Sequence, residues 1–443
     1  MPTVIGVIFA ALGFYCMTRG EDWLLGFLLF SGLFQAASVI NFGSAGIQPF
    51  YLAACLFLFA RAVRNPFWRQ DVQFRGKKLL LAFGCLGVLS AVAFPVVFSG
   101  IPVYSPKVGI DDGFFYRPPL QLSGGNAAQA VYLVVELLTV WAAASAMKTR
   151  NTRIFYDFCF WFLAALIFVQ FIFLQLGLPF PYGVFQNNPG YAMANVSLGN
   201  SSERVIGTFT EASGAGLALA VFYAGYFYEF YSRAGSILKV MTAAITIGLV
   251  RSSSSIAAML AATALIVVLC PLYRFPWAIR RSRFWKLMLI SVVAALIALS
   301  PAIGGFAEYT TEKSETLSYL HRTAADLFSI QLAAQTHWIG VGLGSNRPSS
   351  LLASLLSNVG AAGLFLFLLI IVQMVRNARG NHTWLSWALF AAVFDMCLGG
   401  PDITQPMLWI LMTLAAYYGS TERELTLSSG QPIGAKTGIQ DGS

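Results

Sequence analysis

Long apolar runs dominate this sequence and restrict the chain to one class of fold. Only 11% of the 443 residues are charged, against about 25% in soluble globular proteins, so the chain cannot cover itself with enough polar surface to dissolve. A bilayer-spanning helix needs about 20 mostly apolar residues. Thirteen runs approach that length, at approximately residues 3–17, 23–40, 47–63, 79–99, 126–147, 155–177, 209–230, 236–250, 254–271, 287–303, 350–375, 384–398 and 406–419. We therefore predict an all-α polytopic membrane protein, with 12 or 13 transmembrane helices in a single integral membrane domain over residues 1–419.

The distribution of lysine and arginine predicts which side of the membrane each connection faces. Of the 28 lysines and arginines, 21 fall in one alternating set of connections. The other set contains only Lys107, Arg117, Arg204, Arg251, Lys313, Arg322 and Arg347. Because basic residues accumulate in cytoplasmic connections, the larger set is predicted to be cytoplasmic, and this excess accounts for the net charge of +9 without a nucleic-acid partner.

This orientation gives the outer side its long connections. They cover about residues 100–125, 178–208 and 304–349, whereas the cytoplasmic connections are short and basic. The polar residues 420–443 are rich in Gly and Ser and are predicted to form a disordered cytoplasmic tail.

Four outer arginines lie beside the ends of apolar runs and are candidate ligands for an anion. Arg204 begins the stretch Arg204-Val-Ile-Gly-Thr-Phe-Thr-Glu211 at the entry to a span, Arg251 precedes four serines, and Arg322 and Arg347 lie in the connection 304–349. A guanidinium stays charged and binds phosphate through two parallel hydrogen bonds. Two or three of them could neutralise a lipid pyrophosphate without a metal or another cofactor, and the six widely spaced cysteines give no metal-binding pattern.

Each of these candidates also has a structural interpretation. Arg204 could pair with the neighbouring Glu203, and Arg251 could occupy a simple outer turn. Arg322 could support its own helix through an i,i+4 pair with Asp326. The lone His337 is more typical of interfacial packing than of catalysis.

Four carboxylates in or beside the spans could serve the arginines as partners. Glu211 lies just inside a span, where a charge costs roughly 2.5–3.5 kcal/mol or more. Glu136 is near the middle of the fifth run, and Asp395 and Asp402 flank the outer end of the twelfth. A proton or cation relay is an alternative use of these acids, but we favour their pairing with the outer arginines.

The connection 304–349 contains two further patterns. One is an apolar series at helical spacing, which predicts an amphipathic helix on the outer membrane surface with Arg322, Asp326 and Ser329 on its other face. The series is Leu317, Leu320, Ala324, Leu327 and Phe328. The other is the glycine-rich run 340–344, which follows no strand and is therefore not interpreted as a dinucleotide site. We expect its backbone N–H groups to be offered to an anion.

Together these motifs resemble the bacterial O-antigen polymerase and O-antigen ligase superfamily. The stretch Arg204 to Glu211 before a span, and Arg251 with its serines, are similar to one outer region of that family. His337-Trp-Ile-Gly-Val-Gly-Leu-Gly-Ser, followed by Asn358-Val-Gly-Ala-Ala-Gly363, is similar to the second. The resemblance covers about residues 130–400, and the number of spans and the two long outer loops with short amphipathic helices agree with it.

The resemblance implies a GT-C-like membrane glycosyltransferase in the bacterial inner membrane, with its active site facing the periplasm. Its substrate would be an oligosaccharide on undecaprenyl pyrophosphate, and no metal or cofactor would be needed. Arg204 would bind the pyrophosphate, with Arg251, Arg322 and Arg347 as further candidates. Apart from the resemblance, we assign Glu211 as the general base or as the group that orients the acceptor hydroxyl, since a carboxylate there could take the hydroxyl proton. Asp326, His337 and Asp402 are the candidate supporting residues.

Polymerase, ligase and exporter activities remain as alternatives. Ligases of the superfamily usually carry a His-Asn pair after the glycine-rich run, where this chain has Ser349-Ser350. The sequence therefore favours a polymerase, which joins lipid-linked repeats with inversion if displacement is a single step, over a ligase, which passes finished polymer to lipid A core or protein. A flippase or exporter would need charges deep in many spans, and only Glu136 is so placed. The last alternative is a purely structural subunit of a polysaccharide assembly complex. Membrane lipid, a chain-length regulator and a flippase of the same pathway are the expected partners.

Overall fold

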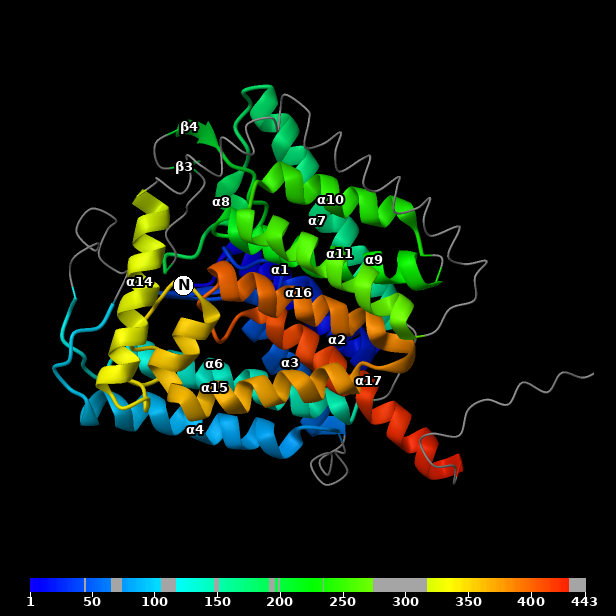
Figure 1. Ribbon diagram of the computed structural model, residues 1–443. Coiled ribbons are helices and arrows are strands. Elements are labelled where there is room, and N and C mark those ends of the chain that lie inside the picture. The colour runs from blue at the N-terminus through cyan, green and yellow to red at the C-terminus, as the bar shows by residue number, and fades with distance from the viewer. Residues whose placement is uncertain are drawn as a thin grey trace, which may run out of the picture.

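The computed structural model describes residues 1–43, 45–64, 74–104, 117–146, 151–190, 196–197, 200–233, 235–273 and 317–429. Most of these residues are helical (Figure 1). The helices are α1 (Val4–Arg19), α2 (Glu21–Ser31), α3 (Pro49–Arg64), α4 (Lys77–Val97), α6 (Gly124–Ala144), α7 (Asn151–Gln175), α8 (Tyr182–Phe185), α9 (Ala212–Arg233), α10 (Ile237–Val250), α11 (Ser253–Tyr273), α14 (Leu317–Gln335), α15 (Leu351–Asn377), the 3-10 turn η1 (Gly380–His382), α16 (Thr383–Gly399) and α17 (Pro406–Ser429). Two short antiparallel hairpins pair β1 (Ile40–Phe42) with β2 (Ala45–Ile47) and β3 (Val196–Ser197) with β4 (Asn200–Glu203).

Within the described part of the chain, five helices are long and apolar enough to cross a bilayer. They comprise Lys77–Val97, Gly124–Ala144, Thr152–Gln175, Ser253–Cys270 and Leu351–Asn377, and four shorter apolar helices accompany them. Apolar side chains on their outer faces are exposed, such as Leu89 on α4 at 59% and Phe365 on α15 at 62%. Exposed apolar faces of this size mark a surface in contact with something other than water. The all-α membrane class predicted from the sequence is therefore confirmed. The apolar run 287–303 lies outside the described residues.

The second predicted span, 23–40, is only partly helical. Helix α2 ends at Ser31, and the chain then turns through residues 32–39 into β1. The backbone groups of this segment bond to distant parts of the chain: Ala36 N–H donates to the Thr208 carbonyl at 3.1 Å, and Val39 N–H to the Ile47 carbonyl at 2.8 Å. These tertiary hydrogen bonds replace helical ones, so an apolar run here became a buried irregular segment.

The boundary predicted for the disordered tail is also corrected. Helix α17 continues to Ser429, so residues 420–429 are helical. This stretch contains Glu422, Arg423, Glu424 and Leu425, all good helix formers that can extend a helix already stabilised by packing. Residues 430–443 lie outside the described part of the chain.

Helix α9 is the centre of the bundle. Leu219, Ala220, Val221 and Phe222 are consecutive and fully buried, as expected of a helix that is apolar on all sides. It packs against α10, α11 and α16. Its first turn follows Glu211 and its last turns carry Glu229, so these two acids mark opposite ends of the bundle.

Ion pairs identify the basic end. Arg153 on α7 pairs with Glu229 at 2.6 Å, and Lys239 on α10 pairs with Asp157 at 2.6 Å. The three helices thus meet at the end that the lysine and arginine count assigned to the cytoplasm. The opposite end is crossed by α14, which stands across the ends of α4, α6 and α15 (Figure 1).

Helix α14 covers the part of the connection 304–349 in which the apolar series predicts a helix. Ala325, Ser329 and Leu332 form its buried face, while Leu320 and Leu327 of the predicted apolar series are 51% and 57% exposed. The buried face is therefore mixed, with Leu332 beside Ala325 and Ser329, while Leu320 and Leu327 turn outward, as apolar residues of a helix at a membrane surface would. Connection 178–208 contains the short helix α8 and the β3–β4 hairpin.

Candidate functional site

The stretch between Arg204 and Glu211 is fixed inside the end of the bundle opposite the Arg153–Glu229 pair, which we call the outer end after its predicted orientation. Ile206 and Gly207 donate their N–H groups to the side-chain oxygen of Gln170 on α7, at 3.0 and 2.7 Å. The Thr208 hydroxyl donates to the Leu33 carbonyl. Residues 205–209 are buried, while Arg204 and Glu211 at the two ends are half-buried. The buried stretch thus fixes the backbone positions of Arg204 and Glu211.

Glu211 pairs with Arg322. The Arg322 Nη2 atom lies 3.8 Å from Glu211 Oε2, with side chains 41% and 43% exposed. The other terminal nitrogen, Nη1, lies 3.0 Å from the position that a Cβ on Gly399 would occupy. The guanidinium therefore lies close over the C-terminal end of α16, and a larger side chain at Gly399 would displace it slightly.

Asp326 has a different role from the pair proposed for it with Arg322. Its Oδ1 atom accepts hydrogen bonds from the backbone N–H groups of Ser349 and Ser350, at 2.7 and 3.1 Å. It thereby fixes the start of α15, where the side chain of Ser350 is the N-cap. The described contacts give Asp326 a structural task.

A buried serine cluster lies on the protein side of Arg322. Ser252 contacts Ser254 at 3.2 Å and Ser255 at 2.9 Å through their hydroxyls. The hydroxyls of Ser254 and Ser255 also face the carboxyl group of Asp395 on α16. The Cβ of Ser254 lies 3.7 Å from the position of a Cβ on Gly399, so the cluster adjoins Arg322. Asp395 Oδ2 is buried and has no hydrogen-bond partner among the described residues.

Arg251 ends a helix. It adopts the left-handed conformation, with φ 54°, at the C-cap of α10, and its N–H donates to the Ile247 carbonyl at 3.2 Å. Its side chain is exposed. The serines that follow Arg251 thus reach the cluster beside Arg322, whereas Arg251 itself forms the turn that precedes them.

The second ion pair joins Arg347 and Asp402. Arg347 Nη2 lies 3.3 Å from Asp402 Oδ2, with side chains 49% and 39% exposed. Asp402 follows Gly399 by three residues, so Arg322 and Arg347 approach the same turn between α16 and α17. Two arginines from one outer segment therefore meet one turn at the outer end of the bundle.

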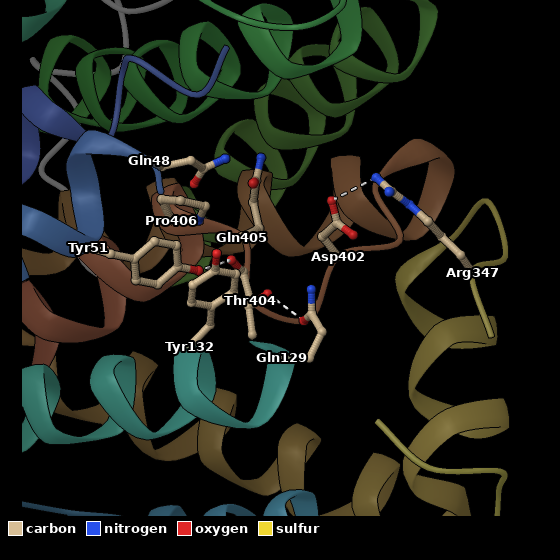
Figure 2. Close-up of a pocket in the computed structure, with 9 residues that line it drawn as sticks. All are labelled: Gln48, Tyr51, Gln129, Tyr132, Arg347, Asp402, Thr404, Gln405 and Pro406. Atoms are coloured by element: carbon tan, nitrogen blue, oxygen red, sulfur yellow. Dashed lines mark hydrogen bonds and ion pairs between the residues drawn. The ribbon is translucent and has the colours of Figure 1, made fainter. Parts of the chain in front are cut away.

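A polar pocket opens beside Asp402. Figure 2 shows its lining, which comprises Gln48, Tyr51, Gln129, Tyr132, Arg347, Asp402, Thr404, Gln405 and Pro406. The Thr404 hydroxyl donates to the Gln129 side-chain oxygen at 2.8 Å. The Tyr51 hydroxyl donates to Glu136 at 3.2 Å, and Glu136 is fully buried.

Gln35 connects this pocket to the Glu211 side of the site. Gln405 Nε2 donates to the Gln35 side-chain oxygen at 3.2 Å. The same oxygen lies 3.6 Å from the position of a Cβ on Gly214, in the first turn of α9 after Glu211. The two ion pairs and the pocket therefore form one outer polar site around the α16–α17 turn.

The glycine-rich run does not present an anion site, which corrects the sequence-based expectation. Val341 and Gly342 donate their N–H groups to the carbonyls of Ser357 and Asn358, at 2.8 and 2.9 Å, and Leu343 donates to the Ser90 hydroxyl at 3.3 Å. A Cβ on Gly342, where φ is 104°, would lie 2.6 Å from the Ser90 carbonyl oxygen. These glycines allow the loop to pack against α4 and α15, and so they position Arg347.

His337 lies outside the outer polar site, and His321 lies beside it. His337 is exposed, with φ 52°, at the turn that ends α14. His321, which sequence reasoning did not select, contacts the Tyr104 hydroxyl next to Arg322. Burial and the Arg322 charge lower the pKa of His321. The sequence around His321 could not predict this contact, because Tyr104 comes from a different connection, 100–125.

Arg117 is a second residue that sequence reasoning left without a role. Its guanidinium lies over the rings of Tyr104 and Phe328, each at 4.7 Å. Burial lowers the pKa of Arg117. The connection 100–125 is thereby tied to α14 through cation–π contacts.

Comparisons with known proteins leave the family open. No protein-family model matches the chain, and a search of curated proteins found no significant match. Among the described residues, no group of three or more His, Cys, Asp or Glu side chains is placed to hold a metal ion.

Proposed function

We propose that this chain is a metal-independent membrane glycosyltransferase that polymerises lipid-linked polysaccharide repeats at the outer face of a bacterial inner membrane. The observation that carries the proposal is the approach of Arg322 and Arg347 to one turn at the outer end of an apolar bundle. A pyrophosphate on a lipid carrier places its anion at that depth, with its hydrocarbon chain along the helices. Guanidinium groups bind such an anion bidentately.

Both ion pairs are partly exposed, so each arginine can exchange its carboxylate partner for another anion. Exposed pairs contribute only about 0–1 kcal/mol, so a pyrophosphate can replace Glu211 at Arg322 and Asp402 at Arg347 at little cost. Each carboxylate released in this way is free to accept a proton. The resemblance described above adds Arg204 as a further pyrophosphate ligand.

The proposed reaction is a single displacement. A hydroxyl oxygen of one lipid-linked repeat bonds to the anomeric carbon of a second glycan while the bond from that carbon to the pyrophosphate oxygen breaks. Glu211, released from Arg322, takes the hydroxyl proton, and the arginines stabilise the negative charge on the departing pyrophosphate. Attack from the opposite face inverts the anomeric configuration.

Polymerisation is favoured over ligation by the start of α15. The superfamily's ligases carry a His-Asn pair there, whereas this chain has Ser349 and Ser350, whose N–H groups are held by Asp326. A residue able to activate an acceptor at this position is missing from the sequence.

The decisive experiment measures the lipid carrier pool and the surface glycan in cells that lack the protein. We expect single repeats on the carrier and no long chains, both restored by the wild-type chain. Long chains stranded on the carrier would instead indicate a ligase. Repeats confined to the cytoplasmic leaflet, detected by their resistance to an external glycosidase, would indicate an exporter.

A further inference from the structure

The pocket beside Asp402 has walls of amides and hydroxyls. Three glutamines, two tyrosines and Thr404 line it, with one ion pair at its mouth and Pro406 as its apolar member. The Tyr51 and Tyr132 rings stack on each other at 4.0 Å and 14°, which turns both hydroxyls to the same region. Figure 2 shows the Gln129 amide nitrogen pointing into the space between Gln129 and Asp402, away from Thr404. The walls thus offer donors and acceptors side by side.

These walls exclude two other classes of ligand. Several wall groups already have partners in the protein, such as Tyr51 with Glu136 and Thr404 with Gln129. A hydrocarbon chain would still bury their remaining donors and acceptors, which costs about 1–3 kcal/mol for each group left unsatisfied. A phosphate inside the pocket would lie beside the Asp402 carboxylate that it displaces from Arg347, and the Tyr51 hydroxyl in the wall already donates to a second carboxyl group, Glu136. An uncharged molecule rich in hydroxyls avoids both costs, because each hydroxyl donates and accepts.

The size of the pocket limits how much of a ligand enters it. The cavity volume is about 50 Å³, and a single water needs roughly 10–15 Å³. Only a few small groups fit, such as two neighbouring hydroxyls or a hydroxymethyl group. The rest of the ligand must remain outside, toward Arg347 and Asp402.

We infer that this pocket binds the hydroxyl-bearing edge of one uncharged sugar ring. Gln129 and Asp402 contact neighbouring hydroxyls at the mouth, and Thr404 holds Gln129 in position through its 2.8 Å hydrogen bond. That this ring belongs to the acceptor repeat rests on the proposed function. The binding of a neutral sugar is independent of the proposed function and can be measured on the isolated protein.

The test is saturation-transfer NMR on the protein in lipid nanodiscs, which avoids sugar-based detergents. The probes are the methyl glycosides of glucose, galactose, mannose and N-acetylglucosamine, with methyl glucuronide and inorganic pyrophosphate for comparison. We expect at least one neutral glycoside to bind, with the strongest transfer to protons on one edge of its ring. Methyl glucuronide should bind at least 10-fold more weakly, and pyrophosphate should not displace the neutral glycoside.

Variants locate the binding. Gln129→Leu should weaken it about 3- to 10-fold, the loss expected for one hydrogen bond. Gln129→Asn keeps the amide on a shorter side chain and serves as the second variant if Gln129→Leu fails to fold. The matched control is Gln175→Leu, at an exposed position at the end of α7, which should bind as wild type does.

Three results would overturn the inference. They are no binding by any neutral glycoside, unchanged binding in both Gln129 variants, or displacement by pyrophosphate. The proposed function fails separately, if cells lacking the protein show no change in their lipid-linked repeats. Binding in the isolated protein would then still assign a neutral-sugar pocket to a protein with another activity.

Discussion

At the scale of single residues, the chemical role proposed for Arg322 can be separated from its structural one. Its pair with Glu211 is 41% and 43% exposed, so the pair contributes less than about 1 kcal/mol to stability. Its proposed contact with a developing pyrophosphate charge is worth more. Removing one such contact typically lowers rates about 10²- to 10³-fold.

Replacing Arg322 by alanine should therefore abolish long polymer while the protein still folds. Polymer length on gels and melting temperature in detergent measure the two effects. Arg376→Ala, at an exposed position in the last turn of α15, is the control and should retain both. Normal polymer from a well-expressed Arg322→Ala variant would remove Arg322 from the mechanism.

Gly399→Ala tests the position of the same guanidinium without removing its charge. The added Cβ would lie 3.0 Å from Arg322 Nη1, so the flexible end of the arginine must shift. We expect polymer yield to fall at least 10-fold, since small displacements of a catalytic group are costly, with little change in melting temperature. Gly248→Ala on α10 meets no atom within 4 Å and should be silent in both measurements. Equal yields from the two variants would contradict the geometry.

His321 should make stability depend on pH. Its pKa is lowered by burial and by Arg322, so below about pH 6.5, the ordinary pKa of histidine, the unfolded state binds more protons than the folded state. Stability is then fully present above that pH and is lost as pH falls through and below it. We expect the melting temperature to fall more between pH 7.5 and 5.5 for wild type than for His321→Asn. Parallel curves would indicate that His321 titrates alike in both states.

At the scale of elements, the glycines of the loop from α14 to α15 serve close packing of the backbone. The sequence had predicted that they bind an anion. Gly342→Ala should destabilise the protein by about 1–3 kcal/mol or more, because the residue has a positive φ and the Cβ would lie 2.6 Å from a backbone oxygen of α4. A lower melting temperature would show this. Gly183→Ala in α8, with no atom within 4 Å, should melt as wild type does. A Gly342→Ala variant with wild-type stability would mean that the loop packs differently.

At the scale of the whole molecule, the charge distribution and the ion pairs agree on two distinct ends. Arg153 and Lys239 pair at the basic end, and Arg322 and Arg347 pair at the other. If the basic end is cytoplasmic, the outer polar site faces the periplasm.

Cysteine labelling tests this orientation. After the six native cysteines are replaced, Gln121→Cys before α6 should react with a membrane-impermeant maleimide in intact spheroplasts. Arg379→Cys after α15 should react only once the membrane is opened. Both positions are exposed, so the two variants serve as each other's control. The reverse pattern would place the site in the cytoplasm and exclude the proposed function.

The sequence by itself determined the class of the fold and most of the charged candidates. Apolar runs predict membrane helices because backbone groups in lipid must bond within their own segment, and outer arginines are visible because they oppose the bias of basic residues. The sequence also predicted α14 from its helical spacing. These signals are local or cumulative along the chain, so no knowledge of packing was needed.

Tertiary structure decided which charges meet. The pairing of Glu211 with Arg322 and of Arg347 with Asp402, the task of Asp326 at the start of α15, and the contact of His321 with Tyr104 all join residues from separate connections. The pocket beside Asp402 is likewise assembled from three helices and three connecting segments (Figure 2). Helical spacing and hydropathy describe one segment at a time, whereas a site of this kind exists only where packed segments converge.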